Sequence, residues 1–187
     1  LWVAVMGGTG TGKSTLFNAL AGRNISSAGT ARPTTMGPVG YGHRNHAVED
    51  EFPLSFLRIE RKKSDPETRA FPDVEEGNLF RYVEHEDDAL SQVIIVDTPD
   101  LDSLEPANRR IADAFYRLSH GIIFVTSQEK YADQVLFRFL KRASSEEKPT
   151  LSFSTRLKRV RTASIWWGCS GNAAFSWKRG ALLSFPS

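Results

Sequence analysis

The chain has 187 residues, a single cysteine and a formal net charge of +2 at pH 7. This length suits one α/β domain and excludes two domains of ordinary size. No apolar run reaches the roughly 18 residues that a membrane-spanning helix needs. Cys169 cannot form an intrachain disulfide, which suits a cytoplasmic location. Because the chain begins at Leu1 and leads directly into an apolar segment, we expect a fragment without a signal peptide.

The positive charge is confined to the end of the chain. Residues 1–149 hold 18 Lys and Arg against 22 Asp and Glu, a net of −4, whereas residues 150–187 hold 6 against none. A basic and aromatic arm for nucleic acid or an anionic membrane would therefore depend on this tail alone. Its candidate residues are Arg156, Lys158, Arg159, Arg161, Trp166, Trp167 and Trp177. Because no groove or amphipathic helix presents them, we do not expect a nucleic-acid partner.

The segment from Gly7 to Ser14 fits the phosphate-binding pattern Gly-x-x-x-x-Gly-Lys-Ser/Thr at every fixed position. An apolar strand, Leu1–Met6, precedes it, and an apolar-faced helix from Lys13 to Leu20 follows, ending before Gly22. Backbone amides of such a loop surround phosphates, the lysine reaches the β- and γ-phosphates, and the serine hydroxyl ligates Mg²⁺. The alternative is a glycine-rich turn that binds nothing. The predicted nucleotide-binding residues here are Gly8, Thr9, Gly10, Thr11, Gly12, Lys13, Ser14 and Thr15.

The loop of residues 23–38 is rich in Ser, Gly, Pro and Thr. Its position one helix after the phosphate loop is where a hydroxyl can complete the Mg²⁺ shell and sense the γ-phosphate. We favour Thr35 for this role, with Thr34 in reserve. An ordinary turn is the alternative.

The clearest buried strand is Val93–Asp97, an all-apolar run that ends in a carboxylate. At the carboxyl end of a strand beside the phosphate loop, Asp97 can hold a water or hydroxyl of the Mg²⁺ shell. It could instead cap a loop. Asp100 follows in the next turn and is also a predicted nucleotide-binding residue.

The remaining pattern alternates strands with helices, which predicts a parallel sheet covered on both faces, with ligands at the carboxyl ends of its strands. Arg61–Lys63 is predicted to lie in a solvated hairpin, and His85 in an acidic surface turn rather than a metal site. The other predicted elements are strands at Val39–Tyr41, Phe52–Ile59, Leu79–Val83 and Gly121–Thr126, and helices at Leu104–Ser119 and Asp133–Ala143.

Three motifs in order resemble the GTPase domain of the dynamin and Era-like GTPases: Gly7–Gly22, Arg32–Thr35 and Asp97–Asp100. The resemblance covers roughly residues 1–145 and implies a phosphate-loop three-layer sandwich with a mostly parallel sheet. It further implies a Mg²⁺-dependent switch that hydrolyses GTP to GDP and phosphate. Lys13 and Thr35 would be catalytic, and Ser14, Thr35 and Asp97 would hold the metal. By analogy with the family, partners would be a second copy, an activating protein, a membrane or a ribosome.

Three positions depart from the family pattern. Asp100 replaces a glycine whose amide senses the γ-phosphate, and its carboxylate adds negative charge there. Leu101 stands where Ras-like proteins place a water-orienting glutamine, so hydrolysis should be slow without a partner. Gly10 replaces the asparagine associated with potassium activation in some Era-like members.

The family's Asn-Lys-x-Asp motif, whose aspartate reads guanine, is absent, and Leu151–Lys158 stands in place of the strand before it. We therefore divide the chain into an incomplete GTPase domain, 1–149, and a disordered tail, 150–187. A two-base shift of the codons for Leu151–Lys158 can spell an apolar run followed by Asn-Lys, so we hypothesise that the tail is translated out of frame. The encoding DNA tests this.

Two other functions remain open. A nucleotide-binding module without turnover is favoured by Asp100, Leu101 and the missing motif. An ATP-using phosphate-loop protein also fits Gly10–Leu16, but the chain lacks both a Leu-Ser-Gly-Gly-Gln signature and a glutamate directly after Asp97.

Overall fold

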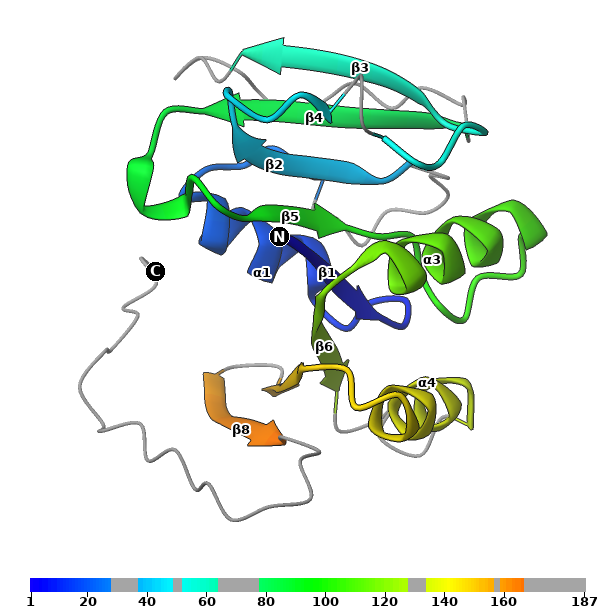
Figure 1. Cartoon of the computed structure of the whole chain (residues 1–187). Helices are drawn as coiled ribbons and strands as arrows, with labels where there is room; N and C mark the ends of the chain where they lie inside the picture. Colours follow the sequence, from blue (N-terminus) through cyan, green and yellow to red (C-terminus); the bar gives the residue numbers. More distant parts are fainter. Residues whose placement is uncertain (28–36, 49–51, 64–77, 128–133, 157–158, 167–187) are drawn as a thin grey trace.

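A computed structural model describes residues 1–27, 37–48, 52–63, 78–127, 134–156 and 159–166. Within them the chain forms an eight-stranded sheet in the order β3-β4-β2-β5-β1-β6-β7-β8 (Figure 1). Neighbouring strands are parallel except in two pairs, β2 with β5 and β7 with β8. The strands are β1 (Trp2–Gly7), β2 (Val39–His43), β3 (Arg58–Lys63), β4 (Leu79–His85), β5 (Ile94–Asp97), β6 (Gly121–Ser127), β7 (Thr150–Arg156) and β8 (Arg159–Trp166).

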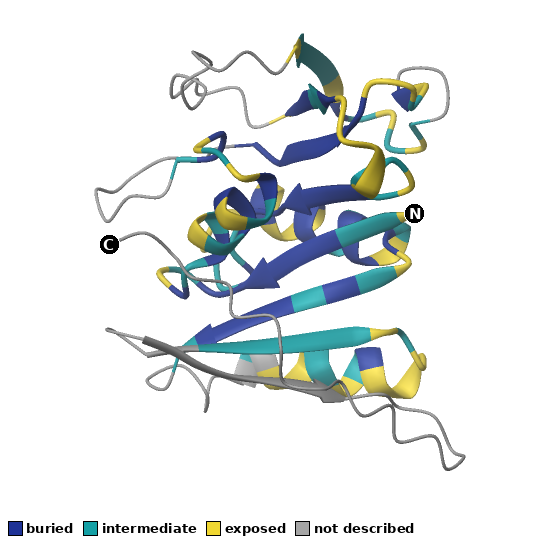
Figure 2. Cartoon of the chain, turned by 90° about the vertical axis from the view of Figure 1, so that its left-hand side faces the viewer, coloured by how far each residue is buried: buried dark blue, intermediate teal, exposed yellow. Residues whose placement is uncertain are grey.

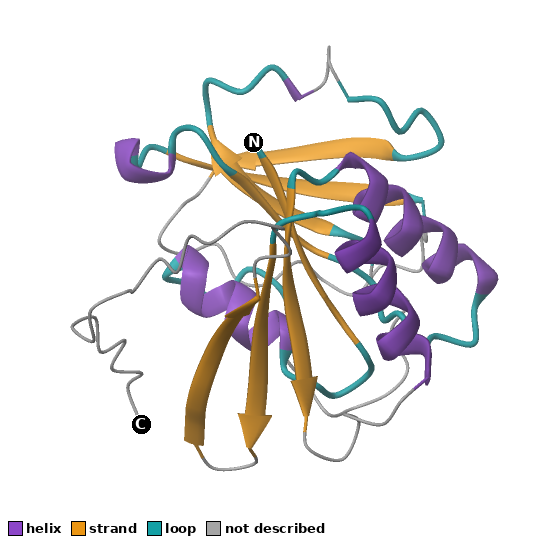
Figure 3. Ribbon diagram, turned by 60° about the horizontal axis from the view of Figure 1, so that its bottom comes forward, coloured by secondary structure: helices purple, strands orange, loops and turns teal. Residues whose placement is uncertain are grey.

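Helices cover both faces of the sheet (Figure 3). One face carries α1 (Lys13–Ala21), and the other carries α3 (Pro106–Leu118) and α4 (Gln134–Ser145). A short 3₁₀ helix, η1 (Asp88–Leu90), links β4 to β5. The predicted three-layer α/β sandwich with a mostly parallel sheet is therefore confirmed.

Strand β1 shows why the central strands have continuous apolar sequences. Val5 packs with Phe17 of α1, whereas its neighbours Ala4 and Met6 pack with α3-side residues such as Tyr116. A strand that is buried on both faces needs apolar residues at every position. The central strands in Figure 2 are accordingly buried along most of their length.

The predicted strand at Phe52–Ile59 is wrong for most of its length. The backbone turns at Leu54, whose carbonyl accepts a hydrogen bond from the Leu57 amide at 2.9 Å, and β3 begins only at Arg58. The aromatic side chains of this segment pack against the α3-side core instead. Arg61–Lys63 thus lies in an edge strand parallel to β4 rather than in a solvated hairpin. Charged side chains on an edge strand hinder pairing with another chain.

His85 is also not in a surface turn. It ends β4, is 5% exposed, and lies 4.4 Å from Tyr41 between ring centroids. Burial and the neighbouring His43 lower the pKa of His85. No group of three or more potential metal ligands was found among the described residues.

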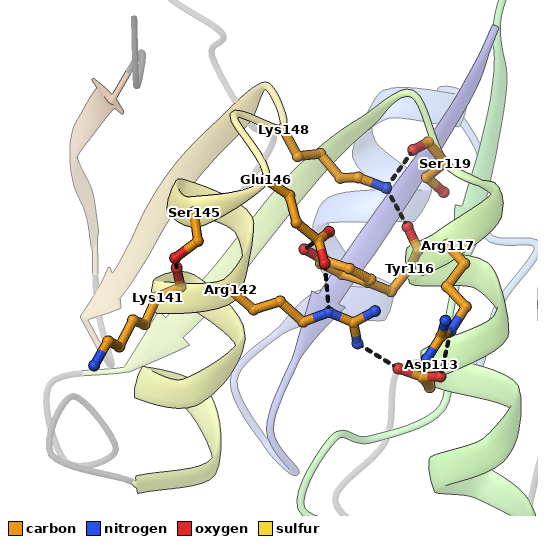
Figure 4. Close-up of polar contacts among 9 residues, drawn as sticks. All are labelled: Asp113, Tyr116, Arg117, Ser119, Lys141, Arg142, Ser145, Glu146 and Lys148. Carbon is orange, nitrogen blue, oxygen red and sulfur yellow. Dashed lines mark hydrogen bonds and ion pairs between the residues drawn. The ribbon is translucent and has the colours of Figure 1, made fainter. Parts of the chain in front are cut away.

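A polar network joins α3 to α4 and to Lys148 in the connection that follows α4 (Figure 4). Arg142 of α4 donates to Asp113 of α3 at 2.6 Å and to Glu146 at 2.9 Å, and its guanidinium lies 4.2 Å from the centre of the Tyr116 ring. Lys148 donates to the Ser119 carbonyl at 2.8 Å. This network fixes the connection that brings β7 beside β6.

Replacing Arg142 with alanine should lower the free energy of unfolding by about 1–2 kcal/mol. The change removes a half-buried ion pair with Asp113 and a cation–π contact with Tyr116. Urea unfolding measures the loss, with Arg138→Ala, an exposed arginine of the same helix, as the control. Equal effects of the two substitutions would contradict a specific role for the network.

Acid should weaken the same network. Partial burial would raise the pKa of Asp113, but hydrogen bonds from Arg117 and Arg142 outweigh it and lower the pKa. The Tyr116 hydroxyl, followed by Arg142, lowers the pKa of Glu146. Both carboxylates therefore stabilise the fold above their ordinary pKa of about 4, and this contribution is lost as the pH falls through the lowered folded values. The stability difference between wild type and Arg142→Ala should shrink between about pH 7 and about pH 3.

The sheet continues past the predicted domain boundary at residue 149. β7 pairs parallel to β6, with Thr150 opposite Ile122, and β8 pairs antiparallel to β7. Residues 167–187, the rest of the predicted tail, lie outside the described residues. In the part of the chain that the structure describes, no helix combines the length and the apolar character needed to cross a membrane.

Candidate nucleotide-binding site

The phosphate loop leads from β1 into α1 with the backbone that its glycines allow. Gly10 and Gly12 have φ values of 71° and 91°, in the left-handed region that side chains disfavour. At Gly7, an added Cβ would lie 2.2 Å from the Val125 carbonyl oxygen, so the close packing of β1 on β6 requires glycine. The Thr11 hydroxyl donates to the Gly8 carbonyl at 2.8 Å and closes the loop into a turn.

Lys13 curls back over this loop. Its ammonium donates to the Gly8 carbonyl at 3.1 Å and forms an ion pair with Asp100. The side chain is only 6% exposed. A lysine held in this way presents its charge at the mouth of the loop, where a phosphate would bind.

Asp97 lies at the carboxyl end of β5, directly beside β1. The two strands are parallel, with Asp97 opposite Val5. The Asp97 carboxylate therefore lies at the same edge of the sheet as the phosphate loop, which follows β1. The Ser26 hydroxyl donates to Asp97 Oδ2 at 2.6 Å, and the Ser14 side chain lies close to the same carboxylate. Burial raises the pKa of Asp97, while Lys13 and the two serine hydroxyls oppose this effect.

These residues fit a bound Mg²⁺. Asp97 Oδ1 is buried without a hydrogen-bond partner among the described residues, and the Ser14 hydroxyl lies beside the same carboxylate. Carboxylate and hydroxyl oxygens are the ligands that Mg²⁺ prefers. A buried oxygen without a partner is costly, and a metal-bound water would satisfy it.

The loop from β5 to α3 closes over the phosphate loop through a second carboxylate that the sequence analysis did not single out. Asp102 Oδ1 accepts from the Thr9 amide at 2.7 Å and from the Thr9 hydroxyl at 2.8 Å. The Leu101 amide donates to the Gly7 carbonyl at 3.1 Å. We call Asp100 and Asp102 the acidic clasp, because each carboxylate binds a residue of the phosphate loop: Asp100 binds Lys13 and Asp102 binds Thr9. One loop amide predicted for nucleotide binding is therefore occupied.

The side chain of Leu101 points away from the site. It is 2% exposed and packs in the α3-side core with Ala112 and Tyr116. An apolar side chain in this position cannot orient a water molecule.

The structure thus brings together most of the predicted site. Lys13, Ser14, Asp97 and Asp100 meet at one edge of the sheet, whereas Gly10 and Thr15 are exposed at the rim. Thr34 and Thr35 lie outside the described residues. Sequence reasoning missed Asn18 and Ser26, although a buried polar side chain next to Phe17 in an apolar helix face is a usable signal.

Comparisons with known proteins agree with this architecture. A family model described as "Dynamin family" matches residues 3–154. One solved structure, described as "An oligomerised bacterial dynamin pair provides a mechanism for the long range sensing and tethering of membranes", is similar with a TM-score of 0.51 at 14% identity. A second, similarly described bacterial dynamin pair gives a TM-score of 0.48, also at 14% identity. Each match covers 77% of this chain and 25% of the other, so the chain spans a quarter of those proteins' length. No curated protein matches the chain.

The family match covers most of the chain and includes both the phosphate loop and Asp97. The first of the two solved structures has the same fold as this chain. The dynamin part of the predicted resemblance is therefore confirmed, and the chain belongs to the dynamin family.

Proposed function

We propose that this chain binds GTP with Mg²⁺, hydrolyses it to GDP and phosphate, and works as a conformational switch. The observation that carries the proposal is the meeting of Lys13, Ser14 and Asp97 at the carboxyl ends of β1 and β5. Phosphate-loop hydrolases use the same three groups: a lysine and a hydroxyl at the start of the helix after the loop, and a carboxylate at the end of a neighbouring strand.

Each residue has a definite part in this proposal. The loop amides and Lys13 bind and orient the phosphates, while Ser14 and Asp97 hold the metal. Thr35 is the proposed third metal residue and γ-phosphate sensor. When bound, Mg²⁺ neutralises charge on the β- and γ-phosphate oxygens.

Turnover by the isolated chain should be slow. Leu101 is buried in the core and cannot orient the attacking water. Ras, a phosphate-loop GTPase, hydrolyses GTP without its activating protein at about 3–5 × 10⁻⁴ per second. An activating protein or a second copy of the chain would supply the missing group.

A nucleotide-binding module without turnover is the second candidate. The ion pair between Lys13 and Asp100 favours it, because it occupies the amine that would stabilise charge on the γ-phosphate. The structure thus gives this alternative a physical basis beyond the sequence difference.

Single-turnover hydrolysis separates the two candidates. With protein in excess over GTP and Mg²⁺ present, the first candidate predicts slow conversion to GDP, abolished when EDTA removes the metal. Tight GTP binding with no GDP formed over many hours would leave the second candidate. Conversion that is indifferent to EDTA would contradict a Mg²⁺ site at Asp97.

Self-association and membrane contact are proposals based on the similar structure, which is described as an oligomerised pair that tethers membranes. We also propose a cytoplasmic location. The division into a GTPase domain of residues 1–149 and an out-of-frame tail of residues 150–187 likewise stays a proposal, which sequencing of the encoding DNA tests.

A further inference from the structure

The segment after α1 is fixed to the metal-binding carboxylate by two buried side chains. Asn18 Oδ1 accepts from the backbone amides of Ile25 at 3.0 Å and Ser26 at 2.9 Å, and its amide nitrogen donates to the Ser26 carbonyl at 2.7 Å. Asn18 and Ser26 are each 6% exposed. Three hydrogen bonds to one side chain of α1 therefore hold the backbone of Ile25 and Ser26 in place.

The Ser26 hydroxyl uses this fixed position to bind Asp97. It donates to Oδ2 at 2.6 Å, while Oδ1 of the same carboxylate has no hydrogen-bond partner among the described residues. The two oxygens of Asp97 therefore differ: one is occupied by a neutral donor and the other is open. A hydroxyl that donates to one oxygen also prevents the carboxylate from rotating freely.

We propose that Ser26 is a positioning residue, which holds Asp97 so that Oδ1 faces the Mg²⁺ shell, with Asn18 as its support. This inference depends on the proposed function, because it assigns Ser26 a role in Mg²⁺-assisted nucleotide binding. Residues that orient metal ligands typically contribute 10- to 100-fold to metal affinity. Ser26 lies outside the phosphate loop, in the loop of residues 23–38, where only Thr34 and Thr35 are predicted to act on the metal.

The test is the Mg²⁺ dependence of fluorescent GDP binding to the full chain and to Ser26→Ala. We expect the Mg²⁺ concentration for half-maximal GDP affinity to rise about tenfold in the variant. GDP affinity in EDTA should stay within about twofold of wild type, because Ser26 does not touch the phosphate loop. Ser26→Thr, which keeps the hydroxyl, should restore the Mg²⁺ dependence. Ser145→Ala, which removes a serine hydroxyl bond on α4, is the matched control.

Equal losses with Mg²⁺ and in EDTA would mean that Ser26 only supports the fold, and would overturn the inference. An unchanged or lowered Mg²⁺ requirement would overturn it as well. Failure of the proposed function is a different result, visible in wild type alone: no GDP binding, or GDP binding that Mg²⁺ does not affect. That outcome overturns both.

Discussion

Replacing Lys13 with alanine should weaken the binding of GDP and GTP at least about 100-fold, equivalent to about 2.7 kcal/mol. The ammonium lies at the phosphate loop, where it donates to the Gly8 carbonyl and forms an ion pair with Asp100. Its loss removes direct attraction to the phosphates in a site where water screens charge poorly. Equilibrium titration with a fluorescent nucleotide measures the change.

Lys141→Ala is the control for Lys13→Ala, because it removes an exposed lysine on α4. Lys13→Gln, which retains more of the side chain's length, guards against loss of the fold, and circular dichroism checks both variants. Nucleotide binding within about threefold of wild type in folded Lys13→Ala would contradict the site.

Replacing Asp100 with asparagine should tighten GTP binding about tenfold, a change of about 1.4 kcal/mol. The Asp100 carboxylate pairs with Lys13 and is one third exposed. Asparagine keeps the size of the side chain, frees the ammonium and removes a negative charge from the region of the γ-phosphate. Two unit charges about 4 Å apart interact by about 4 kcal/mol near a protein surface, and solvent exposure reduces the net effect.

Two comparisons make the Asp100→Asn experiment specific. Glu105→Gln removes an exposed carboxylate at the start of α3 and should leave GTP binding unchanged. In the Lys13→Ala background, Asp100→Asn should lose most of its gain, because the amine that it frees is gone. If Asp100→Asn instead weakens GTP binding, the acidic clasp supports nucleotide binding rather than competing with it.

The central part of the fold could be predicted from the sequence, because a strand that is buried on both faces has apolar residues at nearly every position. β1, β5 and β6 are apolar at nearly every position, and Gly22 ends α1 with a φ of 69°. The peripheral strand β3 has no such apolar pattern. Its charged sequence, Arg58–Lys63, is half-exposed and pairs with β4 through its backbone and through the ion pair of Arg61 with Glu84.

The same distinction applies to the site. Lys13, Ser14 and Asp97 could be predicted because a motif and a strand end fix their positions along the chain. Asp102 could not, because its contact with Thr9 depends on how the loop after β5 folds back over the phosphate loop. Ser26 reaches Asp97 across 71 residues of sequence, so local patterns hold no information on that bond.

The binding selectivity of the full chain is the most direct test of the account. Fluorescent GDP with Mg²⁺ should bind, and unlabelled GTP and GDP should displace it while ATP does not. Lys13, Ser14 and Asp97 predict that nucleotide binds, and the proposed GTP-dependent function predicts the preference for guanine over adenine. Displacement by ATP as effective as by GTP, or no binding at all, would contradict it.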